Sequence, residues 1–174
     1  MKENHFKILL ILIILLLQNL SFAQNKFKDV IIDDCQKMTK AVKEKKYEDN
    51  VDFIYPKIIK IYGINKHKLA KLSRDSYEKA ENEGYVVQDI FFDEPEKIYF
   101  AGSELHCIIK RTTIMRTPKG DFSQVHYMLA ISSNKGKNWY YLETHTLDQE
   151  KIEKIFPNFN YELKIPKKSA LKKI

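Results

Sequence analysis

The sequence predicts an α+β fold in which N-terminal helices pack on a strongly curved, cone-like antiparallel sheet. Apolar residues recur with a helical period over residues 28–83. From residue 85 onward, β-branched and aromatic residues dominate, and short turn sequences separate the apolar segments. Helices followed by hairpin-linked strands are typical of an α+β plan. A curved sheet wrapped around the helices would bury both layers.

Three helices are expected before the sheet. The first covers residues 28–46, and its apolar face is formed by Ile31, Cys35, Met38 and Val42. The second covers about 48–62 and contains Pro56, so we expect it to start late, kink or break there. Asn65 is the expected N-cap of a third helix over 66–83. The buried side of this third helix is expected to consist of Leu69, Leu72, Ser76 and Ala80.

Five strands are expected after residue 84. Their predicted ranges are 85–92, 98–101, 104–115, 122–132 and 138–146. Turn sequences at 117–121 and 134–137 connect the last three. A capping box at 146–149 predicts a short helix that Pro157 ends. Residues 158–174 are then expected to form an extended basic tail.

Residues 1–23 have the pattern of a secretory signal peptide. Two lysines precede ten uninterrupted aliphatic residues at 8–17, and small residues precede the expected cleavage site after Ala23. We therefore expect export to the periplasm or beyond the cell. An uncleaved anchor is the alternative, but a membrane span needs about 17–25 apolar residues. The mature chain should then be one domain over 24–157 plus the tail, with no membrane span.

The positive net charge of +7 is concentrated at the C-terminus. Residues 24–163 contain 23 basic and 22 acidic residues, and the last eleven residues contain five lysines. A basic tail can contact an anionic surface, but a solvated terminus explains it as well and is the interpretation we favour. No basic patch interleaved with aromatic residues is present, so we expect no nucleic-acid partner.

Two cysteines are present, Cys35 on the predicted first helix and Cys107 on a predicted strand. An oxidising destination would permit a disulfide between them. Two free thiols acting as small apolar residues are the alternative. The sequence leaves both outcomes open.

Element order and two local segments resemble the nuclear transport factor 2-like superfamily. The segments are DFIYPK at 52–57 and NKGKNWYY at 134–141, and similar segments occur in small exported bacterial proteins. The resemblance implies a cone-shaped domain whose interior can hold a ligand. Members include isomerases, cyclase-like enzymes, dehydratases and non-catalytic binding or assembly modules. None of their catalytic motifs matches this chain, so no catalytic residue is carried over.

Strand pairing predicts one mixed face on the sheet. If the 134–137 loop has four residues, His126 lies opposite His145 and Met128 lies opposite Glu143. If Pro118 faces Asp121 in the preceding hairpin, Thr113 and Arg111 join this face opposite His126 and Met128. Cys107, Ile109, Trp139 and Tyr141 also fall on it. The opposite, more apolar face is expected to be the helix-covered core, which leaves the mixed face as an outer surface or a groove.

Five residues of the mixed face are candidate ligand-binding residues: His126, His145, Glu143, Trp139 and Tyr141. The two imidazoles could act as an acid–base pair or as ligands for zinc or copper. Two ordinary surface histidines are the interpretation that we favour, so we expect no metal. We expect no cofactor either, because the chain has no glycine-rich phosphate loop or other linear catalytic signature.

These observations predict an exported, non-catalytic module that binds a small apolar molecule or a protein partner through the mouth of the cone. The alternative is a small isomerase or hydrolyase-type enzyme that uses a cone-interior histidine or acid. A homodimer formed through an exposed sheet face is a third expectation.

Overall fold

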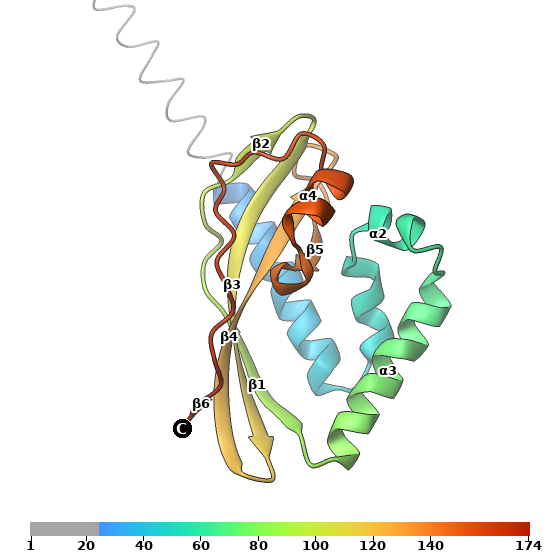
Figure 1. The fold of residues 1–174 in the computed structure, drawn as a ribbon, viewed down its shortest axis with the longest axis vertical. Helices are drawn as coiled ribbons and strands as arrows, with labels where there is room; N and C mark the ends of the chain where they lie inside the picture. Colours follow the sequence, from blue (N-terminus) through green and yellow to red (C-terminus); the bar gives the residue numbers. More distant parts are fainter. Residues whose placement is uncertain (1–24) are drawn as a thin grey trace, which may run out of the picture.

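A computed structural model describes residues 25–174 and shows helices packed on an antiparallel sheet (Figure 1). The expected α+β class with an antiparallel sheet is confirmed. The strong, cone-like curvature is not confirmed, because the sheet is open and its edge strands do not meet. No described helix has the length and apolar composition of a membrane span. The predicted signal peptide at 1–23 lies outside the described residues.

Proline divides the second predicted helix into two short elements. The first helix is described over residues 25–43, and a 3-10 helix, η1 (Tyr47–Phe53), follows it. Helix α2 (Pro56–Ile61) then starts with Pro56 in its first turn. Proline lacks a backbone N–H, so it suits the first turn of a helix but not the interior. The break expected at Pro56 is therefore confirmed.

Helix α3 (Lys66–Asn82) begins where the capping signal placed it. The backbone N–H of Lys68 donates to Asn65 Oδ1 at 2.8 Å. Its rotation, however, differs from the predicted one. Leu72 is 49% exposed, and Tyr77 instead faces inward and stacks on Tyr47 of η1, with ring centroids 4.3 Å apart. The prediction that Leu72 and Ser76 are buried was wrong, because an aromatic contact with η1 sets the buried side.

Two long strands carry the sheet, β3 (Glu104–Thr117) and β4 (Gly120–Ser132). Shorter strands flank them and each covers only part of their length (Figure 1). On the outer edge of β3 lie β1 (Val86–Phe92) and β2 (Tyr99–Ala101). On the outer edge of β4 lie β5 (Tyr140–Glu143) and the two-residue β6 (Lys172–Lys173).

The pairing of β4 with β5 follows the prediction, with Met128 opposite Glu143. The β3–β4 register differs by two residues, because the turn closes at Thr117 and Gly120. Arg111, not Thr113, therefore lies opposite His126. A two-residue shift keeps every side chain on its predicted face. A further correction concerns β5, which ends at Glu143, so that a 3-10 turn, η2 (Thr144–Thr146), takes the place of the last predicted residues of the strand.

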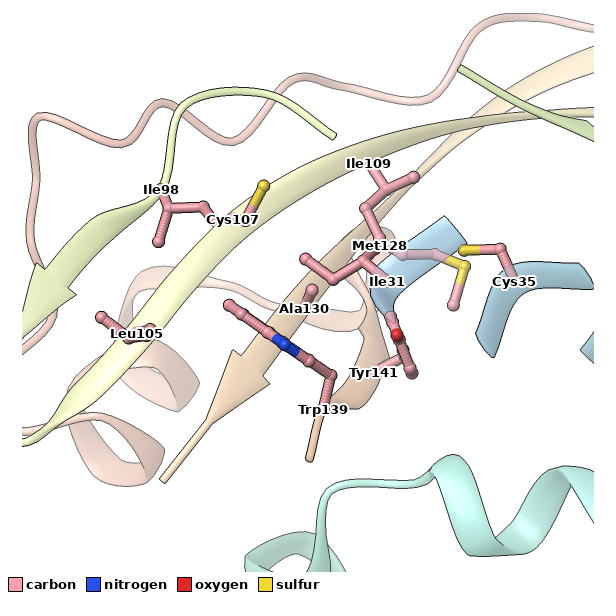
Figure 2. Close-up of a cluster of buried hydrophobic side chains, with 10 residues drawn as sticks. All are labelled: Ile31, Cys35, Ile98, Leu105, Cys107, Ile109, Met128, Ala130, Trp139 and Tyr141. Carbon is pink, nitrogen blue, oxygen red and sulfur yellow. The ribbon is translucent and has the colours of Figure 1, made fainter. Parts of the chain in front are cut away.

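Both faces of the sheet are covered. The mixed face packs on the helix over residues 25–43, which contributes Ile31 and Cys35 (Figure 2). The expectation of an outer surface was wrong, because the apolar end of this face packs on the apolar stripe of that helix. The alternative, a groove, corresponds to a cavity that remains on the same face. The opposite face packs against helix α4 (Gln149–Ile155) and the residues that follow it.

The C-terminal segment is part of this second core rather than a free tail. Phe159 and Leu163 are buried, at 8% and 4% exposure. Further along, the backbone N–H of Ser169 donates to Val125 O at 2.9 Å, and β6 pairs with β4. The predicted solvated tail at 158–174 is therefore corrected for its first part, because Phe159 and Leu163 pack in the second core. Residues 167–174 are exposed as predicted, although part of their backbone pairs with β4.

Cys35 and Cys107 are both free thiols buried in the cluster drawn in Figure 2. The disulfide that the sequence left open is not formed. Burial raises the pKa of each thiol to about 12. Both residues therefore act as small apolar core residues with little nucleophilic character.

Candidate functional site

A cavity of about 400 Å³ lies between the mixed face of the sheet and the N-terminal helical elements. The first helix, η1 and α3 form its roof, and strands β1, β3, β4 and β5 form its floor. Most of the wall is apolar. The apolar lining includes Met38, Val42, Phe53, Ile90, Phe92, Met115 and Met128.

A β-bulge shapes the β1 side of the cavity. Val87 pairs with Met115, whereas Asp89 pairs with the next residue along β3, Ile114. Gln88 is thus an extra residue in β1. The bulge breaks strict alternation, so both Val87 and Ile90 line the cavity.

The polar part of the floor comes from three adjacent strands. Arg111 of β3 and His126 of β4 are cross-strand partners, and Glu143 of β5 lies one strand further. Arg111 Nη1 is 2.6 Å from Glu143 Oε1, and these side chains are only 22% and 29% exposed. The guanidinium and the carboxylate compensate each other's charge inside the cavity.

His126 is a neutral imidazole at neutral pH. Burial lowers its pKa below the usual value, and the positive charge of Arg111 lowers it further. A neutral ring offers one donor and one acceptor nitrogen. Its Nδ1 is buried and has no hydrogen-bond partner within the described residues.

Three more buried polar atoms around the cavity lack hydrogen-bond partners among residues 25–174. They are Arg111 Nε, Glu143 Oε2 and Asn50 Oδ1. Leaving a buried donor or acceptor unpaired costs about 1–3 kcal/mol each. Such atoms are therefore rare in native proteins, and a bound molecule or an ordered water can supply the missing partner. Of six such side-chain atoms among the described residues, four belong to residues that line this cavity, and the other two, on His106 and Trp139, lie in the apolar clusters.

Tyr141 lines the cavity but its hydroxyl is already engaged. The hydroxyl donates to Asp34 Oδ2 of the first helix at 3.0 Å. Burial raises the pKa of Asp34, whereas the Tyr141 hydrogen bond acts in the opposite direction. This bond fixes the first helix over the sheet and holds one wall of the cavity in place.

Trp139 lies outside the cavity. It is 2% exposed and packs edge-to-face on Phe27, with ring centroids 6.2 Å apart. Figure 2 shows it next to Tyr141 within the apolar cluster. The structure therefore places Trp139 in the core rather than at a ligand.

His145 adjoins the cavity from η2. Its ring centroid is 6.1 Å from that of His126, and its Nδ1 is 3.5 Å from Glu143 Oε2. His145 is 37% exposed, so it borders solvent on one side and the polar floor on the other. These two imidazoles and the carboxylate are the described groups able to hold a metal ion together.

Of the five candidate residues, the structure brings His126, Glu143 and Tyr141 to the cavity and His145 to its edge. The candidate set lacked Arg111, although strand alternation had placed this residue on the same face. Asn50 and Tyr77 were also missed, because they come from helical elements and no pattern in the sequence relates them to the sheet.

No protein-family model, curated protein or solved structure matches this chain. The functional conclusion therefore depends on the geometry of the cavity and the chemistry of its lining.

Proposed function

We propose that this chain is an exported, non-catalytic module that binds one small, neutral, amphipathic molecule in the cavity. The observation that carries the proposal is the combination of an apolar cavity of about 400 Å³ with partnerless buried polar atoms on its floor. Small-molecule sites are typically concave and mostly apolar, with a few polar groups that fix orientation.

The lining also defines the chemistry of the ligand. Arg111 and Glu143 are paired in charge, and His126 is neutral, so a charged organic ligand inside the cavity finds no net counter-charge. Arg111 Nε calls for an acceptor, such as a carbonyl or hydroxyl oxygen. Asn50 Oδ1 calls for a donor. The remainder of the ligand should be apolar, to match the methionine and phenylalanine side chains of the wall.

Membership of the nuclear transport factor 2-like superfamily is part of the same proposal. Support comes from N-terminal helices that cover one face of an antiparallel sheet, with a cavity between the two layers. A cone-like curvature around that cavity would complete the resemblance. Export is proposed from the signal-peptide pattern of residues 1–23.

Fluorescence titration with N-phenyl-1-naphthylamine, a neutral apolar probe with one N–H donor, tests the proposal. The probe should brighten on binding the full chain. Thr113, which is 7% exposed, lines the cavity, so Thr113→Phe should fill it and weaken binding at least about tenfold. Thr112→Phe is the matched control, because the adjacent strand residue points to the opposite face. Equal binding by both variants would rule out the cavity as the site.

A second candidate function is proton transfer at carbon, as in an isomerase or hydrolyase. The observation that favours it is the location of an imidazole and a carboxylate, His126 and Glu143, on the floor of a largely apolar cavity. If this function is correct, the chain should catalyse deuterium exchange next to the carbonyl of small ketones, and His126→Gln should abolish it. NMR spectroscopy in deuterium oxide measures the exchange, and a rate equal to the buffer background would exclude this candidate for the ketones tested.

A further inference from the structure

We propose that His126, Glu143 and His145 form a binding site for one divalent transition-metal ion of the zinc type at the edge of the cavity. The three residues come from β4, β5 and η2, and their candidate ligand atoms all lie within 4.8 Å of one another. Two imidazoles and one carboxylate are a ligand set that suits zinc and leaves coordination positions open.

The distances are close to those of a metal site. Zinc bonds to nitrogen and oxygen measure about 2.0–2.2 Å, which places two ligand atoms of a tetrahedral site about 3.4 Å apart. His145 Nδ1 and Glu143 Oε2 are already separated by 3.5 Å. The remaining separations must shorten by up to about 1.4 Å, which ring rotation can achieve because His145 borders solvent.

The buried atoms without hydrogen-bond partners point to the same site independently. Glu143 Oε2 and His126 Nδ1 are both buried and have no partner among the described residues. A metal ion coordinated by Glu143 Oε2 would satisfy that oxygen. Coordination of the same ion by His126 would fix the orientation of the imidazole ring.

Arg111 orients the Glu143 carboxylate toward the proposed metal site. Its Nη1 holds Glu143 Oε1 at 2.6 Å, which leaves Oε2 turned toward His145. Hydrogen-bonded partners of this kind commonly orient metal ligands. The guanidinium also opposes a nearby cation, so we expect weaker binding than at a structural zinc site with four protein ligands.

Such an ion would face both solvent and cavity. The 37% exposure of His145 provides a route for the ion, and His126 and Glu143 also line the cavity. The open coordination positions could then contact the polar end of a bound molecule. Metal binding itself does not require that molecule, so it can be tested without one.

Isothermal titration calorimetry of the untagged full chain with Zn²⁺, after removal of metal by EDTA and dialysis, tests the proposal. We expect one ion per chain. His126→Gln and His145→Gln should each weaken binding at least about tenfold. His67→Gln is the matched control, because His67 is exposed in the first turn of α3 and does not belong to the cluster. Absence of binding, or unchanged affinity in both cluster variants, would overturn the proposal.

Thermal unfolding separates a binding defect from a folding defect. Metal-free His145→Gln should melt like the metal-free wild-type chain, because His145 is substantially exposed. At the same Zn²⁺ concentration, the melting temperature of the wild-type chain should rise by more than that of His145→Gln. An equal rise in both would contradict the site. Binding of N-phenyl-1-naphthylamine in the presence of EDTA would show that the cavity binds an organic molecule without a metal ion, so the proposed function would stand even if the metal proposal failed.

Discussion

At the scale of single residues, a buried polar network links Tyr55, the residue that precedes α2, to Glu104 and His106 of strand β3. The Tyr55 hydroxyl donates to Glu104 Oε1, and His106 Nε2 lies 3.1 Å from Glu104 Oε2. His106 is fully buried and packs edge-to-face on Phe156. Burial alone would raise the pKa of Glu104, but the hydrogen bonds from His106 and Tyr55 outweigh it and lower that pKa below 4.5.

This network predicts a pH dependence of stability. In the unfolded chain Glu104 regains its ordinary pKa of 4.5 and binds a proton more readily than in the folded chain. Its contribution is therefore present above that pH and is lost as the pH falls through the lower folded value. Urea unfolding between about pH 7 and pH 3 should show this loss, and Glu104→Gln should reduce it. Glu162→Gln, at an exposed residue, is the control and should leave the dependence of the unfolding free energy on pH as in the wild-type chain. If Glu104→Gln also showed the wild-type dependence, the account would be contradicted.

The two thiols give a second prediction at this scale. Because burial raises the pKa of Cys35 and Cys107 to about 12, both should react slowly with Ellman's reagent at about pH 8 in the native chain. In denaturant, two thiols per chain should react at once. Rapid labelling of the native chain, or no thiols after denaturation, would contradict the buried, unbridged state.

At the scale of elements, the C-terminal segment is the clearest test of packing. Leu163 is 4% exposed in the second core cluster, whereas the neighbouring Lys164 is exposed. Leu163→Ala should lower the free energy of unfolding by about 2–5 kcal/mol, and Lys164→Ala by no more than about 0.5 kcal/mol. Urea denaturation measures both. Equal stability of the two variants would mean that the segment is a solvated tail.

Elements with strong local signals were predictable from the sequence. The Asn65 cap, the break at Pro56 and the positions of the two hairpin turns depend on residues within a few positions of one another, although the β3–β4 register differs by two residues. The rotation of α3 was not predictable, because it depends on Tyr47, thirty residues before Tyr77. The packing of the C-terminal segment likewise depends on a sheet face that is distant in the sequence.

At the scale of the whole molecule, the sequence predicted the class and the composition of each sheet face but not which layer covers which face. Alternation along β4 placed His126 and Met128 together, and that depends only on strand geometry. Hydrophobicity alone correctly predicted a helix-covered core on the opposite face, where α4 packs. It did not predict that the N-terminal helix covers the mixed face as well. The largely apolar cavity, with its polar floor, exists because the N-terminal helix and α3 cover the mixed face without filling it.

The central claim is that this cavity holds a small neutral molecule, and its methionines allow a direct test. The chain has four methionines, and Met38, Met115 and Met128 line the cavity. A full chain labelled with carbon-13 at the methionine methyl groups, assigned by Met→Leu substitution, can be titrated with N-phenyl-1-naphthylamine. The account predicts that all three cavity methyl resonances shift, because the naphthalene ring lies against them, and that they saturate together with the fluorescence. If the fluorescence saturates while these three resonances stay in place, the probe binds elsewhere and the claim is contradicted.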